Sequence, residues 1–214
     1  MLDMVSIDLV DLVYKFRKEE KEQHQRVECV YWVTDLTRCP LKRTYEFKYP
    51  ELIAKDVFSP IFIMGDLAHR GVESLIKEFF LNAASVEVEG SRELTLPNGR
   101  KVIIRGRVDA IIDLGEGSSV GVEVKTARAD LGIPQQHHID QVRIYNWLFN
   151  LSYSILFYVT PDRVTQFEVR DRAAEEEIIE RITSSTYPRY PWECSYCPFS
   201  VLCPHKKVLN DRHR

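Results

Sequence analysis

Two stretches of alternating apolar residues lie at the centre of the chain, KVIIRGRVDAIID at residues 101–113 and VGVEVKTA at residues 120–127. Alternation with a period of two predicts β-strands that cover a core with one face. The sequence GEGSS at residues 115–119 separates them and predicts a tight turn. We therefore expect these two strands to pair in an antiparallel manner.

Further strand signals surround this pair. VEVEGSREL at residues 86–94 alternates, and the turn signal Pro97-Asn98-Gly99 joins it to the next strand. These three segments predict an antiparallel meander. YSILFYVT at residues 153–160 and VTQFEV at residues 164–169 predict two more strands around a Pro161-Asp162 turn, and ECVYWV at residues 28–33 predicts a short strand.

Helical spacing of apolar residues predicts helices over residues 5–22, 60–82 and 135–150, and an acidic helix over 172–184. Thr34 or Asp35 is expected to cap a short helical segment that includes Cys39. A sheet flanked by helices makes the fold α/β (α+β). The apolar face of the 60–82 helix comprises Ile63, Leu67, Val72, Leu75, Ile76 and Phe79.

The amino-acid composition limits the classes of protein to which this chain could belong. Hydrophobic residues make up 44% of the 214 residues, which is enough for a core and excludes a disordered chain. With a net charge of −3, the protein as a whole does not attract nucleic acid, so contacts to nucleic acid would need local basic patches. No apolar run approaches the ~18 residues of a membrane span, and MLDMVSIDLVDLV lacks a basic signal-peptide region, so we expect a cytoplasmic protein. Five cysteines then indicate metal or redox chemistry more than disulfides.

Asp109, Glu123 and Lys125 form the first chemical constellation. Glu123 and Lys125 are two apart on one strand and share a face, and the turn brings Asp109 beside them. Two carboxylates suit a hard cation such as Mg²⁺ or Mn²⁺, and the lysine can hold a water or steady charge on a phosphate. The alternative is a Glu–Lys pair on an exposed strand face, with the neighbouring valines pointing inward.

Residues on two expected helices extend this constellation. His69 follows Gly65 by four residues, and the glycine lets that helix approach the sheet, so the imidazole could complete a metal shell. Gln141 and Tyr145 are four apart and share a face of the 135–150 helix, where they could hydrogen-bond a phosphate or the lysine. Each has an ordinary alternative, an exposed histidine or a tyrosine packed in the core.

Cys194, Cys197 and Cys203 lie within ten residues and could share one metal centre. A fourth ligand must come from elsewhere, with Cys39, Cys29 and His205 as candidates. These cysteines are compatible with an iron–sulfur cluster, with a structural zinc, or with small buried side chains that bind no metal.

Four segments together resemble RecB-type nucleases of the PD-(D/E)XK superfamily: Gly65-Asp-Leu-Ala-His69, Gly106-Arg-Val-Asp109, Glu123-Val-Lys125 and Gln141-Val-Arg-Ile-Tyr145. The resemblance implies a restriction-endonuclease-like core that hydrolyses DNA phosphodiester bonds with a metal-activated water. It implies that His69, Asp109, Glu123 and the Val124 carbonyl bind the cation and that Lys125 is catalytic. Gln141 and Tyr145 would shape the site or touch DNA.

One cysteine before these motifs and three after them resembles the iron–sulfur members of this group. The implied ligands are Cys39, Cys194, Cys197 and Cys203, holding a [4Fe-4S] cluster or, alternatively, a [2Fe-2S] cluster. Cys29 is expected to be a buried free thiol, with a ligand swap with Cys39 as the alternative. The resemblance divides the chain into an N-terminal helix and strand (1–33), a first cluster segment (34–59), a nuclease core (60–185) and a cysteine-rich segment (186–214).

The size and cysteine layout most resemble the CRISPR-associated nucleases of spacer acquisition. This implies action on single-stranded DNA or strand ends, with CRISPR adaptation (integrase) proteins as partners. A DNA-repair nuclease outside CRISPR and a non-catalytic, metal-stabilised DNA- or partner-binding module are the alternatives.

Basic residues near the motifs are the candidates for phosphate contacts, which need only charge and reach. Aromatic residues could stack on unpaired bases, with core packing as the alternative. The basic candidates are Lys42, Arg43, Arg105, Arg107 and Arg128, with Lys206 and Lys207 as a further group, and the aromatic ones are Tyr31, Trp32 and Trp192.

Overall fold

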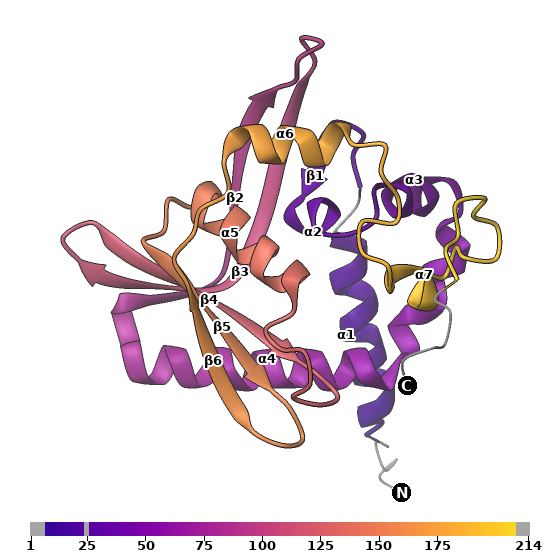
Figure 1. Ribbon diagram of the computed structural model, residues 1–214. Coiled ribbons are helices and arrows are strands. Elements are labelled where there is room, and N and C mark those ends of the chain that lie inside the picture. Colours follow the sequence, from indigo (N-terminus) through magenta and orange to yellow (C-terminus); the bar gives the residue numbers. More distant parts are fainter. Residues whose placement is uncertain (1–6, 24–25, 209–214) are drawn as a thin grey trace, which may run out of the picture.

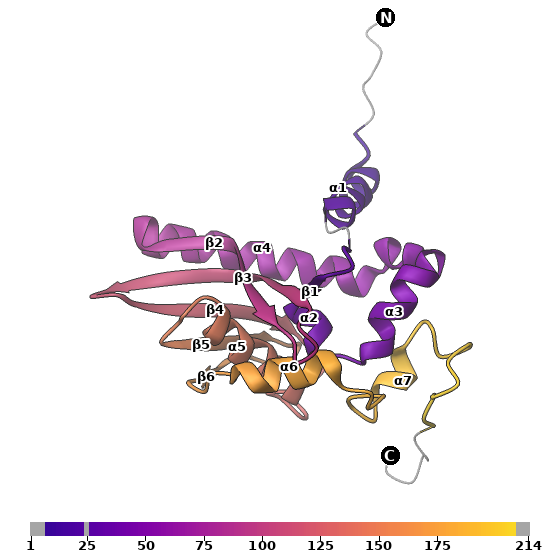
Figure 2. The same ribbon diagram turned by 90° about the horizontal axis from the view of Figure 1, so that it is seen from above.

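The computed structural model describes residues 7–23 and 26–208. A six-stranded mixed sheet forms the middle layer, with helix α4 on one face and helices α5 and α6 on the other (Figure 1, Figure 2). The helices are α1 (Leu9–Gln23), α2 (Val33–Leu36), α3 (Pro40–Lys48), η1 (Pro50–Phe58), α4 (Pro60–Phe80), η2 (Leu81–Ala83), α5 (Gln136–Leu148), α6 (Glu175–Thr183) and α7 (Glu193–Tyr196). The strands are β1 (Val30–Trp32), β2 (Ala84–Thr95), β3 (Lys101–Gly115), β4 (Ser118–Thr126), β5 (Tyr153–Val159) and β6 (Val164–Val169).

The expected meander is confirmed, because β2, β3 and β4 pair antiparallel in sequence order. Strands β5 and β6 also form where expected, β5 parallel to β4 and β6 antiparallel to β5. Helices α4, α5 and α6 form within the expected ranges, each slightly shorter than its apolar pattern. The helix expected over residues 5–22 is observed from Leu9, and residues 5 and 6 lie outside the described residues.

The short helix expected to include Cys39 is wrong. Two helices form there, and Cys39 lies between them as the residue before α3. Pro40 explains the break, since its fixed φ suits the first position of a helix and disfavours a helical residue before it. Helix α3 and the 3₁₀ helix η1 were not foreseen, because their apolar residues show little regular spacing.

Strand β3 has different neighbours along its two edges. Strand β2 pairs along nearly the whole of one edge. The other edge is shared: β1 pairs in parallel with Ile103–Arg105, and β4 pairs antiparallel from Ala110 onward. Residues 106–109 therefore have no ladder partner on this edge. This gap in the sheet opens the backbone of β3 to side chains from other elements.

The two faces of the sheet are packed unequally. The main core lies under α5 and includes Val102, Ile104 and Val108, whereas a small cluster of Ala110, Ile112 and Val122 packs beside α4. The predicted apolar face of α4 is only partly covered. None of its residues is fully buried, and Leu67, Leu75 and Phe79 are exposed. The space between α4 and the sheet forms the cavity described below.

Gly106 allows α5 to pack closely over the gap in β3. A Cβ atom at this position would lie 2.7 Å from a Leu148 methyl and 2.8 Å from the Tyr145 ring. Real Cβ atoms do not approach other atoms so closely, so any other residue would force the Leu148 and Tyr145 side chains, or α5 with them, to shift. The glycine of the Gly106–Asp109 motif thus sets the distance between the helix and the sheet.

The segment around Cys39 lies beside the C-terminal segment, far away in the sequence (Figure 1). The Cys39 main-chain N–H donates to Glu193 Oε1 at 2.5 Å, and the Arg189 guanidinium donates to the Arg38 carbonyl at 3.1 Å. Arg181 likewise donates to the Leu36 carbonyl. Among the described residues, no helix combines the length and apolarity needed to cross a membrane.

Candidate metal-dependent active site

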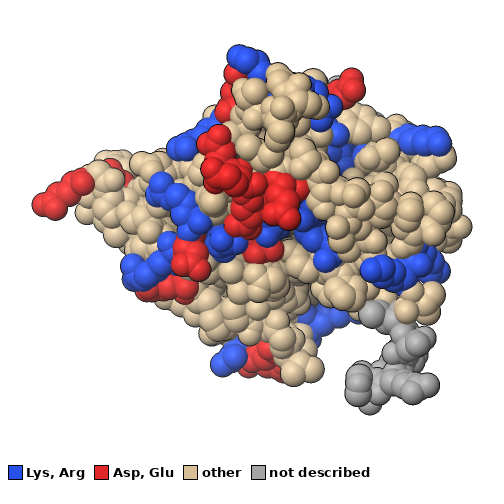
Figure 3. Space-filling model, turned by 45° about the horizontal axis from the view of Figure 1, so that its top comes forward, with Lys and Arg blue, Asp and Glu red and all other residues tan. Residues whose placement is uncertain are grey.

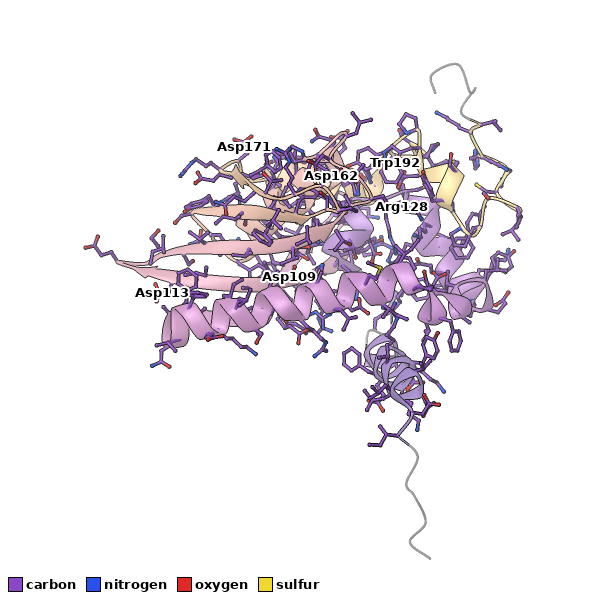
Figure 4. The ribbon with its side chains drawn as sticks, turned by 90° about the horizontal axis from the view of Figure 1, so that it is seen from below. Asp109, Asp113, Arg128, Asp162, Asp171 and Trp192 are labelled. Atoms are coloured by element: carbon purple, nitrogen blue, oxygen red, sulfur yellow. The ribbon has the colours of Figure 1, made fainter. Side chains whose placement is uncertain are left out.

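Asp109 lies at the point where β3 and β4 separate. The pairing of these two strands ends at Ala110 and Val122. Beyond it, the Asp109 side chain takes the place of a main-chain carbonyl of β3, because its Oδ2 atom accepts the Val124 N–H at 2.7 Å. The carboxylate is therefore fixed against β4, beside Glu123 and Lys125. In Figure 4 Asp109 lies over the middle of α4, whereas Asp113 lies farther along the sheet toward one end.

Glu123 is buried, with 3% of its surface exposed. Its Oε1 atom accepts hydrogen bonds from Lys125 Nζ at 2.6 Å and Gln141 Nε2 at 2.7 Å, while Oε2 has no hydrogen-bond partner among the described residues. Burial, and then the negative charge of Asp109, raise the pKa of Glu123 to about 7. The exposed Glu–Lys pair considered as an alternative is therefore not what forms. A buried acceptor without a donor is costly unless a ligand satisfies it.

Helix α5 supports this carboxylate from the other side. Gln141 and Tyr145 face Glu123 together, as their spacing predicted, and both are buried. The Gln141 amide contacts the Tyr145 hydroxyl at 3.1 Å, and that hydroxyl donates to the Arg107 carbonyl at 2.8 Å. The carbonyl is accessible because residues 106–109 have no ladder partner on that edge of β3. Tyr145 and Gln141 thus connect the gap in β3 to Glu123.

Helix α4 contributes His69, whose Nδ1 lies 3.1 Å from Asp109 Oδ2. Burial lowers the pKa of His69, but the hydrogen bond and charge of Asp109 outweigh it, so the pKa is raised overall. Gly65 lies close to the sheet one turn earlier; a Cβ there would meet Thr126 Oγ1 at 3.5 Å, an ordinary contact, so its absence is not required for the approach.

Glu73, which the sequence reasoning did not single out, joins this group. One ligand atom each from His69, Glu73 and Asp109 lies within 4.8 Å of the others. Burial, then the charges of Asp109 and Glu87, raise the pKa of Glu73. Its position four residues after His69 was the available signal, since such residues share a helix face.

These side chains line one cavity of about 630 Å³ between α4 and the break in the sheet. This volume lies within the range of small-molecule and cofactor sites. Besides the acidic groups, basic residues line the cavity, among them Arg107, Arg70 and Arg26. The arrangement gathers carboxylates and an imidazole that could ligate a divalent cation, and it places a lysine beside them that could balance negative charge on a phosphate.

The four cysteines assigned to a cluster line a second cavity, of about 250 Å³. Cys39 comes from the segment before α3, and Cys194, Cys197 and Cys203 come from the C-terminal segment. Thr34 and Gln141 line both this cavity and the first one. The two candidate sites therefore adjoin each other through α5.

Hydrogen-bond donors surround the sulfur atoms. The Lys207 N–H donates to Cys194 Sγ at 3.4 Å, and Tyr45 hydrogen-bonds Cys203. Burial raises the pKa of Cys39 and of Cys197, while main-chain N–H donors oppose that effect at each sulfur. Such donors stabilise thiolates bound to a metal centre.

Cys29 was expected to be buried, and this is wrong: it is exposed. It precedes β1, and only its main chain takes part in the sheet, with the Cys29 carbonyl accepting the Ile103 N–H at 2.9 Å. Cys29 does not line the cavity of the other four cysteines, so the swap with Cys39 finds no support in the geometry.

Two of the five basic residues expected to contact DNA, Arg43 and Lys42, are partly buried against other parts of the fold. The Arg43 guanidinium lies over the Tyr31 and Phe47 rings and donates to the carbonyls of residues 27, 28 and 30. Lys42 lines the cysteine cavity, where burial and then the charge of Arg38 lower its pKa. A DNA contact by Arg43 would have to replace these bonds, and the contact expected of Lys42 stays a prediction.

Arg105, Arg107 and Arg128 remain candidates for phosphate contacts. Arg105 and Arg128 are exposed, and Arg107 lines the acidic cavity with Glu87 3.8 Å away. On the face shown in Figure 3, many acidic side chains gather near the centre, and basic side chains lie around them. Contacts to a polyanion would thus depend on individual arginines near the cavity.

The aromatic residues differ in their surroundings. Trp192 is 39% exposed and stacks on Tyr190 at 5.8 Å, with His137 on another side at 4.9 Å. Tyr31 and Trp32 are partly buried beside Arg43 and Arg105 respectively. Burial and then the charge of Lys125 lower the pKa of His137 to about 4, so this imidazole is neutral near pH 7.

Comparison with known proteins agrees with this geometry. Residues 68–204 match the model of the PD-(D/E)XK nuclease superfamily. The chain is 41% identical over 202 residues to the CRISPR-associated exonuclease Cas4 of Saccharolobus solfataricus, covering 92% of this chain and 98% of that protein. The crystal structure of SSO0001 superposes with a TM-score of 0.88 at 41% identity, covering 94% of this chain and 98% of that one. The chain therefore belongs to the PD-(D/E)XK nuclease superfamily, in the same family as that Cas4 exonuclease.

Proposed function

We propose that this protein is a divalent-metal-dependent DNA exonuclease that trims single-stranded DNA or strand ends during CRISPR spacer acquisition. The observation that carries the proposal is the convergence of Asp109, Glu123 and Lys125 in one cavity, with a buried Glu123 oxygen that lacks a donor. The name of the Cas4 relative supports an exonuclease and a CRISPR role.

The residues fit a cation such as Mg²⁺ or Mn²⁺. Asp109 and Glu123 would hold it, with the Val124 carbonyl and His69 completing the protein ligands. When bound, the cation supplies a water of lowered pKa and positive charge opposite the phosphate. The unpartnered Glu123 oxygen is the group in this structure that such an ion would satisfy.

The protein's own groups then position the reaction. Lys125 Nζ, 2.6 Å from Glu123, would hold the attacking water or a phosphate oxygen and balance the negative charge. Gln141 restrains Glu123 Oε1, and Tyr145 restrains Gln141 through its bond to the Arg107 carbonyl. Arg105, Arg107 and Arg128 would contact the DNA backbone, and Trp192 would stack on an unpaired base.

The second cavity would hold an iron–sulfur cluster, [4Fe-4S] or alternatively [2Fe-2S], on Cys39, Cys194, Cys197 and Cys203. The four cysteines around one cavity and the N–H donors directed at their sulfurs support this assignment. Because the ligands come from two segments far apart in sequence, the cluster would fasten the segment before α3 to the C-terminal segment. This role is structural, and the adaptation proteins of CRISPR systems are the proposed partners.

The experiment that tests the proposal is cleavage of end-labelled single- and double-stranded DNA by anaerobically purified protein with Mg²⁺ or Mn²⁺. We expect stepwise shortening of single strands and ends, abolished by EDTA. DNA binding without cleavage under any divalent metal would instead favour the non-catalytic binding module. Pull-down with a purified CRISPR integrase separates the CRISPR role from DNA repair.

A further inference from the structure

The backbone of Glu87 has an unusual conformation. Among the described residues other than glycine, Glu87 alone has a positive φ inside a strand, at 49°. The other three with a positive φ, Leu81, Glu116 and Asn150, lie at a helix end or in turns. This conformation is unfavourable for a residue with a side chain, because Cβ approaches the following carbonyl oxygen. A strained residue that lines an active-site cavity suggests a role in that site.

Glu87 lies where β2 changes the face toward which its apolar side chains point. Val88 packs against the main core under α5, whereas Val86 packs against the small cluster beside α4. Their partners on β3 belong to the same two clusters. In a regular strand, residues two apart share a face, so the backbone must turn between them. The turn falls at Glu87 and, on β3, at Asp109, the two residues between these pairs.

The Glu87 carboxylate lies beside Arg107, and both side chains line the cavity of Asp109. Glu87 Oε1 is 3.8 Å from Arg107 Nη1. The main chain of Arg107 is held separately, because its carbonyl accepts a hydrogen bond from the Tyr145 hydroxyl at 2.8 Å. The main chain of Arg107 is therefore fixed from α5, and its guanidinium is oriented by a charge from β2.

The guanidinium of Arg107 keeps its hydrogen-bond donors available. The distance to Glu87 is that of an ion pair and exceeds that of a hydrogen bond, and the side chain donates to none of the other described residues. A guanidinium presents five N–H donors in a fixed fork that fits a phosphate. Arg107 precedes Asp109 by two residues on β3, so a phosphate bound there would lie at the same cavity.

We propose that Glu87 is a positioning residue for DNA, which orients the Arg107 guanidinium toward a backbone phosphate beside the bond that is cleaved. The proposal rests on the proposed nuclease function, which supplies the DNA strand. An arginine that is already oriented loses less side-chain freedom when the strand binds, so the affinity for DNA is higher. A carboxylate that merely repels phosphate would have the opposite effect, and its removal would tighten binding.

The test is a double-mutant cycle of Glu87→Gln and Arg107→Ala in the anaerobically purified full-length protein. Fluorescence anisotropy with a labelled single-stranded phosphorothioate oligonucleotide in Ca²⁺ gives the affinity. Arg107→Ala should weaken binding and lower the slope of log affinity against log salt by about 1. Glu87→Gln should weaken binding by about 2- to 10-fold, the effect of ordering one long side chain. The double variant should bind no more weakly than Arg107→Ala.

Cleavage kinetics and two further variants separate positioning from folding. In Glu87→Gln, KM for DNA should rise by the same factor as Kd, while kcat stays within about threefold of wild type. Glu87→Gly removes the carboxylate and the strain together, so it should lose the same affinity without a lower melting temperature. Glu89→Gln is the matched control, because Glu89 is an exposed residue of β2 that pairs with Arg107 but does not line the cavity.

Unchanged or tighter DNA binding by Glu87→Gln would overturn the proposal, as would an equal loss in the Arg107→Ala background or in Glu89→Gln. Glu87→Gly repeats the cycle if Glu87→Gln does not fold. The nuclease function fails separately. Wild type that binds DNA but cuts none with any divalent cation would remove that function and leave the cycle to decide the role of Glu87. Wild type that cuts DNA without coupling between Glu87 and Arg107 would remove the positioning role alone.

Discussion

The carboxylate of Asp109 takes the place of a main-chain acceptor for Val124, with Oδ2 2.7 Å from that nitrogen. The same side chain therefore continues the hydrogen bonding between β3 and β4 and provides a negative charge to the cavity. These two roles can be separated by mutation, because an amide oxygen accepts a hydrogen bond as well as a carboxylate but binds cations weakly.

Asp109→Asn should abolish cleavage while preserving the fold. We expect DNA cleavage to fall by at least about 100-fold through loss of the charged ligand. The free energy of unfolding should stay within about 1 kcal/mol of wild type, since Asn Oδ1 can accept the Val124 N–H. Asp109→Ala should lose about 1 to 3 kcal/mol more, because that donor is left unsatisfied. Denaturant titration measures the stability and single-turnover cleavage measures the activity. Equal stability of Asp109→Asn and Asp109→Ala would contradict the proposed hydrogen bond between Asp109 and Val124.

Lys125→Ala should slow cleavage by about 10² to 10³-fold, the usual effect of removing one group that stabilises transition-state charge. DNA binding should change little, because a single phosphate-neutralising charge contributes modestly to affinity. Lys101→Ala is the control, since Lys101 is exposed and pairs only with Glu93 at the far end of β3. Cleavage by Lys125→Ala within threefold of the control would remove Lys125 from the mechanism.

Gln141→Leu should weaken Mn²⁺ binding by about 10- to 100-fold, the range seen when a group that orients a metal ligand is removed. The reason is that Gln141 Nε2 holds Glu123 Oε1 at 2.7 Å. Gln166→Leu, at an exposed position of β6, should leave the affinity unchanged. Calorimetric titration gives the comparison, and unchanged affinity in Gln141→Leu would show that Glu123 is held by other contacts.

Cation binding should depend on pH through Glu123, whose pKa burial and the Asp109 charge raise to about 7. Below pH 7 the carboxyl of the metal-free protein binds a proton that a cation must displace, so the affinity for Mn²⁺ should fall as pH falls from 7 to 5.5. Calorimetry in buffers of different ionisation enthalpy should detect proton release below pH 7 and little above pH 8. A pH-independent affinity over this range would contradict the prediction.

The stability of the metal-free protein should fall as pH rises, whereas its affinity for the cation should increase. A carboxyl whose folded pKa lies above its ordinary value of 4.5 favours the unfolded state once it ionises. The melting temperature should therefore decrease as pH rises from 5 to 8, and Mn²⁺ should restore it. Glu123→Gln should reduce this slope, which distinguishes Glu123 from the other acidic residues.

Cys194→Ser should lower the content of iron and acid-labile sulfide in anaerobically purified protein and destabilise it, since it removes a ligand that joins two segments. Cys29→Ser is the matched control, because Cys29 is exposed and does not line the cysteine cavity. A colourless wild-type preparation with one zinc per chain would point to zinc instead of iron and sulfide. Equal iron in both variants would remove Cys194 from the ligand set.

The sequence alone determined the strands and helices that carry the site. The alternation in residues 101–113 and 120–127 reflects burial of one side chain in every two, and the Asn98-Gly99 turn requires only local backbone geometry. The same local rule placed Glu123 beside Lys125 and Gln141 beside Tyr145, because residues at these spacings share a face. The four motifs in their order, through their resemblance to RecB-type nucleases, were enough to indicate a nuclease before any distance was known.

Tertiary structure alone decided how these faces meet. Local spacing does not show that β1 and β4 share one edge of β3. This sharing leaves residues 106–109 without a strand partner there, so that Tyr145 of α5 can bond the Arg107 carbonyl and the Asp109 side chain can bond Val124. It does not show that Arg43 bonds other parts of the fold, that Lys42 lies partly buried beside the cysteines or that Cys29 is exposed, since long-range contacts determine burial. Glu73 shares a helix face with His69 four residues earlier, but only the packing of α4 against the sheet shows that this face lines the cavity.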